Sequence, residues 1–81
     1  MHVAVIHRIS DPQGFQQVLE EGGDSFPEGF DLPYQFASED GRTMVCVWDA
    51  PSVDAVREFV DGSVGDYADN EVFAAEPTRS P

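Results

Sequence analysis

The sequence contains no lysine, and its basic side chains are limited to four arginines. Against them stand 16 Asp and Glu residues, which give the 81-residue chain a formal net charge of −12. Such a chain has no basic patch to hold a phosphate backbone, so its composition excludes nucleic acid as a partner. The acidity has three open interpretations: a GC-rich genome that replaces lysine with arginine, a salt-adapted cell that screens acidic surfaces, and a specific acidic binding surface.

Cysteine is also scarce, and long apolar runs are missing. Cys46 stands alone, which excludes an intrachain disulfide and a multi-cysteine metal site and suits a reducing cytoplasm. No apolar stretch approaches the roughly 20 residues that cross a bilayer. The first residues lack the basic start and apolar run of a signal peptide. We therefore expect a cytoplasmic protein that has no membrane partner.

What the chain does contain is a series of alternating and amphipathic segments that predict four strands and two helices. Strands are expected at residues 2–9, 32–38, 43–49 and 71–75. The first helix is expected to open at Ser10-Asp11-Pro12-Gln13, with Ser10 as its cap, and to end at Gly22-Gly23. The second is expected to open at Pro51-Ser52 and to be broken by Gly62 and Gly65.

Two further local signals, one for a turn and one for an edge strand, refine this prediction. Asp40-Gly41 between two apolar runs indicates a hairpin, and Pro33 places the second strand at an edge of the sheet. The order β-α-β-β-α-β is typical of the ferredoxin-like α+β fold, a four-stranded antiparallel sheet with two helices on one face. We expect one such domain at residues 1–77 and a frayed tail at 78–81.

Both faces of the expected sheet are largely apolar, which predicts a partner. Val3 and Val5 alternate with Ala4 and Ile6 along the first strand, where a half-solvated sheet would alternate apolar with polar residues. Two helices cover only one face. We therefore predict a homodimer in which a second copy covers the other face.

The segment from Gly41 to Glu76 resembles a known family. The matching features are a strand with a central cysteine, a helix entry, the helix itself and a final strand, carried by Cys46, Asp49-Ala50-Pro51, Ala55-Val56 and Glu71-Val72. They are similar to the dimeric α+β barrel superfamily and, within it, to short bacterial and archaeal proteins of unassigned function, labelled DUF4242 and sometimes called nickel-binding. The resemblance implies sheet-to-sheet dimers and metal binding, although Arg57-Glu58-Phe59-Val60 stand where a histidine is expected.

Three residues are our candidates for ligand binding: His7, Tyr34 and Trp48. His7 lies on one strand face with Val3 and Val5, either as a core histidine or as a ligand or proton-transfer group in a barrel cavity. Tyr34 either orients a ligand or lies at a subunit rim. Trp48 shares a face with Met44, and the two form either a dimer core, which we favour, or the wall of an apolar pocket.

The remaining chemical groups have simpler interpretations. Cys46 lies mid-strand and is expected to act as a small core hydrophobe. Arg8 faces away from His7 and is expected to pair with one of the many carboxylates. Phe26 and Phe30 either pack beneath their loop or fold over a cavity as a lid.

No catalytic signature accompanies these candidates. The sequence has no phosphate-cradling loop, nucleophile elbow or paired metal-ligand motif, so we predict no catalytic residue and name no cofactor. The expected function is non-enzymatic binding of a small ligand or a metal ion by a homodimer. The alternative is a small cofactor-free enzyme, of the oxygenase or isomerase type found in this superfamily, with His7 or Tyr34 as its acid–base group.

Overall fold

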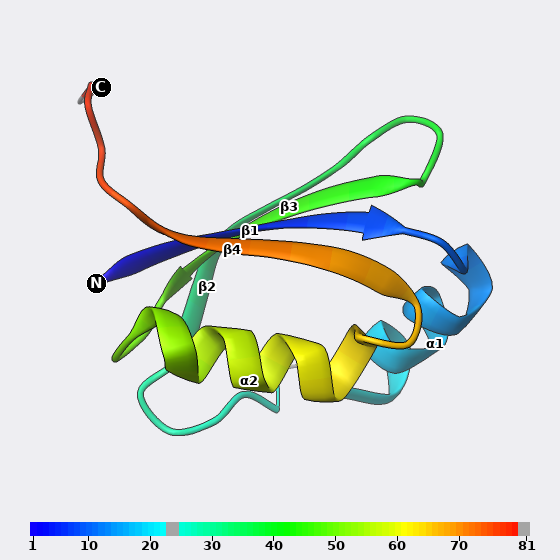
Figure 1. The fold of residues 1–81 in the computed structure, drawn as a ribbon, viewed down its shortest axis with the longest axis horizontal. Coiled ribbons are helices and arrows are strands. Elements are labelled where there is room, and N and C mark those ends of the chain that lie inside the picture. Colours follow the sequence, from blue (N-terminus) through cyan, green and yellow to red (C-terminus); the bar gives the residue numbers. More distant parts are fainter. Residues whose placement is uncertain (23–24, 80–81) are drawn as a thin grey trace.

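A four-stranded sheet and two helices make up the fold in a computed structural model, which describes residues 1–22 and 25–79. The elements are β1 (His2–Ile9), α1 (Pro12–Gly22), β2 (Asp31–Ala37), β3 (Thr43–Asp49), α2 (Val53–Val64) and β4 (Ala68–Ala75). The sheet is antiparallel with the order β2-β3-β1-β4. Both helices lie on the same side of it (Figure 1). The ferredoxin-like fold expected from the sequence is confirmed.

The cap of the first helix lies one residue later than expected. The carboxylate of Asp11 accepts a hydrogen bond from the Gly14 amide at 3.1 Å, which makes Asp11 the capping residue. Ser10 instead donates its hydroxyl to the Tyr67 carbonyl oxygen at 3.1 Å. Ser10 is therefore not the cap, because its hydroxyl instead holds the start of α1 against the turn between α2 and β4. The expected end at Gly22-Gly23 falls partly outside the described residues, as do Asp24 and residues 80–81.

The second helix is longer than the sequence pattern predicted. Ser52 caps it by accepting from the Ala55 amide at 3.0 Å, as expected. Gly62 does not break it, because the helix continues to Val64 and Gly65 forms its C-cap. A glycine in a helix costs only about 1 kcal/mol, which the burial of Val60 and Val64 on either side of it outweighs.

The hairpin between β2 and β3 forms where Asp40-Gly41 predicted it. Gly41 has a φ of 72°, and the Ser38 amide donates to the Thr43 carbonyl oxygen at 2.8 Å. The Ser38 hydroxyl and the Arg42 amide both donate to the Asp40 carboxylate, and these bonds lower the Asp40 pKa. β2 is an edge strand, as Pro33 indicated.

A register shift in β2 decides which of its side chains face the helices. Asp31 pairs with Asp49 and Tyr34 pairs with Val47, so β2 has one residue more than β3 over this stretch. The extra residue places Leu32 and Tyr34 on opposite faces, although they are two positions apart. Regular strand alternation would put Leu32 on one face with Tyr34 and Phe36, and the extra residue prevents this.

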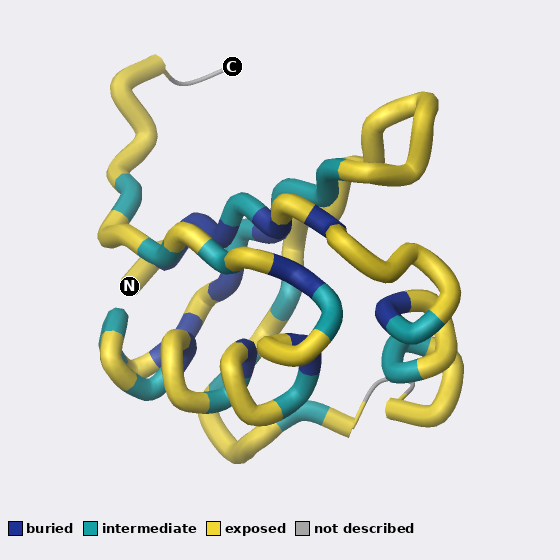
Figure 2. Tube along the Cα trace, turned by 45° about the vertical axis from the view of Figure 1, so that its right-hand side comes forward, coloured by how far each residue is buried: buried dark blue, intermediate teal, exposed yellow. Residues whose placement is uncertain are grey.

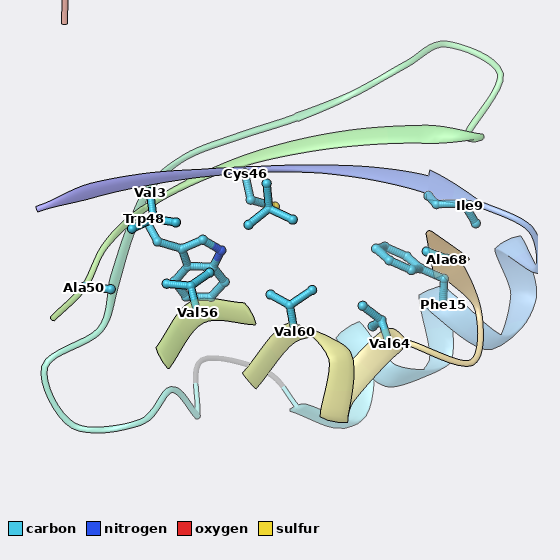
Figure 3. Close-up of a cluster of buried hydrophobic side chains, with 11 residues drawn as sticks. Val3, Ile9, Phe15, Cys46, Trp48, Ala50, Val56, Val60, Val64 and Ala68 are labelled. Atoms are coloured by element: carbon cyan, nitrogen blue, oxygen red, sulfur yellow. The ribbon is translucent and has the colours of Figure 1, made fainter. Parts of the chain in front are cut away.

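The hydrophobic core lies between the sheet and the helices (Figures 2 and 3). The fully buried side chains are Val3 and Val5 from β1 and Val56 from α2. Around them pack further buried residues from every layer, namely Ile9, Phe15, Cys46, Trp48, Ala50, Val60, Val64 and Ala68. Within residues 1–22 and 25–79, no helix is both long enough and apolar enough to cross a membrane.

The opposite side of the sheet, which we call the open face, points away from the helices. Its apolar residues run through all four strands and are Tyr34, Phe36, Val45, Val47, Ala4, Ile6, Phe73 and Ala75. Three of them are large and well exposed, with Phe36 at 63%, Tyr34 at 56% and Phe73 at 42%. The pairing also places Arg8 and Glu71 on this face. They form a 3.1 Å ion pair, which confirms the expected carboxylate partner for Arg8.

Candidate functional site

A cavity of about 420 Å³ lies between the helix side of the sheet and the two helices. Strands β1, β2 and β3, both helices and the loop before β2 all contribute to its wall. Most of the wall is apolar, with Phe15, Val18 and Leu19 from α1 and Phe59, Val60 and Val64 from α2. Its volume falls in the range of about 300–1,000 Å³ that is usual for small-molecule sites.

An aromatic cluster closes one end of the cavity. The Trp48 ring makes edge-to-face contacts with Phe26, Phe30 and Phe59, at centroid distances of 4.9, 5.9 and 5.7 Å. Phe30 also contacts Phe59 at 5.6 Å. Such pairs prefer edge-to-face geometry because the ring edge is positive and the ring face negative. The loop phenylalanines thus pack against the indole and hold it in one orientation.

Trp48 carries an unused hydrogen-bond donor. Its side chain is 95% buried, since only 5% of its surface is exposed. Its Nε1 is inaccessible and has no partner among the residues that the structure describes. Figure 3 shows the indole between β3 and α2, with its nitrogen toward the space between Cys46 and Val60. Both of those residues line the cavity, so the free N–H points toward it, although neighbouring atoms cover the nitrogen in this structure.

His7 is the buried polar group in the described core, with 4% of its surface exposed. Its ring makes an edge-on contact with Phe15 at 5.3 Å. Its Nδ1 lies 2.5 Å from the side-chain oxygen of Asn70, which is the residue directly opposite it on β4. The ring is therefore fixed on both sides while it lines the cavity.

The Asn70 amide determines which nitrogen of His7 carries the proton. Asn70 donates through Nδ2 to the Ala68 carbonyl oxygen at 3.3 Å, so its oxygen is the atom that accepts from His7. His7 must then donate from Nδ1, which leaves Nε2 with a lone pair. Burial lowers the pKa of His7, and the Asn70 bond opposes this only in part, so the ring is neutral at physiological pH.

Two sulfur atoms lie on the wall between His7 and Trp48. Met44 is opposite His7 on β3, and Cys46 follows it on the same face. Gln35 donates to both sulfurs, at 3.4 Å to Met44 Sδ and 3.7 Å to Cys46 Sγ. Burial raises the pKa of the Cys46 thiol, and the Gln35 bond offsets this only in part. Cys46 thus stays a neutral thiol and fits the expected role of a small core residue.

The structure brings two of the three candidate ligand-binding residues together. His7 and Trp48 line one cavity from adjacent strands. Tyr34 lies on the open face, more than half exposed and stacked on Phe36 at 6.4 Å, so it does not join them. The favoured placement of Trp48 and Met44 in a dimer interface is wrong, because both lie on the helix side of the sheet and form the pocket wall.

Two polar residues at this site were not among the sequence candidates. Asn70 precedes the expected start of the last strand at Glu71, whereas β4 begins three residues earlier at Ala68. Extending the strand alternation back from Val72 would place Asn70 on the same face as Val72. Gln35 is the polar residue between Tyr34 and Phe36. That alternation is a detectable signal that its side chain points to the other face.

The described part of the cavity wall carries no formal charge. None of the described residues that line it is Asp, Glu, Lys or Arg. Within residues 1–22 and 25–79, no three His, Cys, Asp or Glu side chains come close enough together to hold a metal ion. The geometry therefore offers a hydrogen-bond donor at Trp48, an acceptor at His7 and a mostly apolar surface between them that also includes the uncharged side chain of Gln35.

No family model, curated protein or solved structure matches the chain. The resemblance to dimeric α+β barrel proteins and to the DUF4242 family therefore stays a prediction.

Proposed function

We propose that this protein binds a small, mostly apolar molecule in the cavity, without converting it chemically. The observation that carries the proposal is the Trp48 Nε1–H, which is buried, points toward the cavity (Figure 3) and has no hydrogen-bond partner among the described residues. Leaving a buried donor without an acceptor costs about 1–3 kcal/mol. A ligand oxygen that moves the covering atoms aside and accepts from this N–H would recover that free energy, and the carbon frame of the ligand would add apolar contact along the wall.

The binding test uses the fact that Trp48 is the only tryptophan in the chain. A panel of neutral aromatic and aliphatic compounds is screened for ligands that raise the thermal midpoint and change the tryptophan fluorescence. We expect compounds with an oxygen acceptor to do both. In Trp48→Phe, the same compounds should raise the midpoint less, whereas Tyr34→Phe on the open face should respond like the wild type. A panel in which no compound shifts the midpoint would contradict the proposal.

Metal binding, which the family resemblance implies, has weaker support. In the described part of the chain, the cavity brings together only His7 and Cys46 from the usual metal-binding residue types, and burial disfavours the Cys46 thiolate. We therefore expect nickel or zinc to leave the thermal midpoint unchanged up to millimolar concentration. A saturable rise would favour the metal over the small molecule.

A second candidate function is proton transfer in a cofactor-free enzyme. His7 favours it, because a neutral imidazole with a fixed tautomer and a free Nε2 can accept a proton from a bound hydroxyl or acidic carbon. The test incubates an identified ligand with the protein and follows its mass spectrum and solvent deuterium uptake. Conversion by the wild type that is lost in His7→Phe would make the protein an enzyme. Recovery of unchanged ligand would leave binding as its function.

We also propose that a second copy of the chain covers the open face. The centre of this face is apolar, and its exposed aromatic side chains would be left in water in a monomer. In a two-fold symmetric dimer the open faces of both copies form the interface, and every contact between them occurs twice. Arg8 of each copy can then meet Glu71 of the other. A self-complementary partner therefore fits both the apolar and the charged residues of this face.

Analytical ultracentrifugation tests the dimer. The wild type should sediment as a dimer in high salt, where repulsion between two copies with charge −12 is screened. Phe36→Glu places a charge on the open face and should give a monomer, while Trp48→Phe in the cavity should remain a dimer. A monomeric wild type in high salt would contradict the proposal.

A further inference from the structure

The cavity contains two fixed polar groups of opposite kind, and they limit what it can bind. At one end, the buried Trp48 Nε1–H can only donate, so a ligand that moves the covering atoms aside must present an acceptor there. At the other end, His7 donates to Asn70 through Nδ1, so its Nε2 can only accept. The ligand must present a hydroxyl or another donor there. A ligand that bonds to both groups therefore needs a hydrogen-bond acceptor at one end and a hydrogen-bond donor at the other.

The distance between the two groups indicates an elongated ligand. Met44 is the β3 residue opposite His7, and Trp48 follows Met44 by four positions on the same strand face. At roughly 3.3 Å per residue, the backbone positions of the two polar groups are about 13 Å apart along the strands. In the interval, Met44 and Cys46 offer sulfur and carbon surface, and the Gln35 side chain donates to both sulfurs. A ligand of fused or linked apolar rings fits this interval.

Charge is the third restriction. The described part of the wall contains no arginine. Arg8 is paired with Glu71 on the open face, and Arg57 is paired with Asp54 on the exposed side of α2. A carboxylate or phosphate that entered the cavity would lose its water without gaining a cation, which is costly. The net charge of −12 on the chain would also repel an anion.

We propose that the cavity selects uncharged, elongated apolar molecules that have an oxygen acceptor near one end and a hydroxyl near the other, and that it rejects the corresponding anions. This inference rests on the proposed binding function and adds the ligand class. His7 sets the preference for the hydroxyl, and Asn70 is the positioning residue that keeps the accepting nitrogen of His7 turned to the ligand.

Three probes on one ring frame test the selection. 6-Methoxy-2-naphthol has both groups, 2,6-dimethoxynaphthalene lacks the hydroxyl donor, and 6-methoxy-2-naphthoate replaces the hydroxyl with a charge. Equilibrium dialysis at pH 7.5 gives their dissociation constants. A neutral hydrogen bond predicts that the naphthol binds about fivefold or more tightly than the dimethoxy compound. The naphthoate should bind more weakly than both.

Variants separate the role of His7 from general packing. His7→Phe keeps an aromatic ring but removes the acceptor, so the naphthol and the dimethoxy compound should bind equally. Asn70→Leu lets His7 place its proton on either nitrogen, so the preference should shrink without disappearing. This second variant keeps the test valid if His7→Phe does not fold. Tyr34→Phe lies on the open face and should keep the wild-type preference.

The outcomes distinguish the two proposals. If the wild type binds all three probes equally, or if His7→Phe keeps the hydroxyl preference, the ligand class is wrong although the cavity still binds apolar molecules. Naphthoate binding as tight as naphthol binding would likewise overturn it. If none of the probes binds and the neutral panel also fails to shift the thermal midpoint, both this inference and the proposed function are wrong.

Discussion

Replacing Trp48 by Phe should change the stability of the protein far less than its burial suggests. Trp48 is 95% buried and contacts three phenylalanines, so the ordinary expectation for a large truncation is severe. The substitution removes two ring carbons and one nitrogen. Two buried carbons are worth roughly 1.6 kcal/mol at about 0.8 kcal/mol each. The lost nitrogen carries the donor that has no described partner, and its removal recovers about 1–3 kcal/mol.

The two contributions have opposite signs, so the net change in unfolding free energy should be about 1.5 kcal/mol or less in either direction. Trp48→Ala removes the whole ring and should cost about 3–5 kcal/mol. Urea unfolding followed by circular dichroism, without added ligand, measures both variants. A loss of 3 kcal/mol or more in Trp48→Phe would refute the reasoning, because it would mean that the indole N–H is already satisfied in the free protein.

Three further predictions follow from the same contacts. A Cβ on Gly14 would lie 2.6 Å from the Tyr67 ring, whereas one on Gly62 would meet nothing within 4 Å. Gly62→Ala should therefore raise the unfolding free energy by about 0.5–1 kcal/mol and Gly14→Ala should lower it, and equal effects in urea melts would contradict the packing. Burial lowers the pKa of His7 in the folded protein below its ordinary value of 6.5, so the imidazole binds a proton more readily in the unfolded chain. The neutral buried His7 therefore contributes stability above pH 6.5, and this contribution is lost as the pH falls from 6.5 through the folded pKa. Urea melts at pH 7.5 and 5.5 should show a smaller loss in His7→Phe than in His2→Asn, and an equal loss would rule out the His7 effect. Buried Cys46, with its raised pKa, should react with a thiol reagent at pH 7.5 far more slowly in the folded protein than in urea, and equal rates would show it to be accessible.

The fold was predictable because its signals are local and agree with one another. β1 and β3 span the residues that alternation predicted, and the hairpin follows from Asp40-Gly41, whose glycine has the positive φ that such turns use. Local sequence propensity predicted the ends of some helices and strands incorrectly. It treated Gly62 as a break and began β4 at Glu71, whereas tertiary packing extends both elements.

The site was harder to predict because it depends on which face each strand turns to the helices. Alternation groups Met44, Cys46 and Trp48 correctly, but it cannot say whether that group meets helices or a second sheet. The same limit applies to the three candidate residues: His7 and Trp48 line one cavity, whereas one extra residue in β2 places Tyr34 on the far side of the sheet. The lone pair on His7 Nε2 was beyond sequence reasoning, since it follows from the Asn70 and Ala68 contacts.

Ligand binding in the cavity and dimerisation through the open face should each raise the stability of the protein, and the two effects can be measured separately. A chain of 81 residues is near the lower size for a self-sufficient core, and here part of its apolar surface lines a 420 Å³ space and part lies exposed. Ligand binding and dimerisation would each bury some of that surface, on opposite sides of one sheet. Mass action makes the first depend on ligand concentration and the second on protein concentration. The thermal midpoint should therefore rise independently along the two axes, and Phe36→Glu should abolish its dependence on protein concentration while leaving the ligand-induced rise intact.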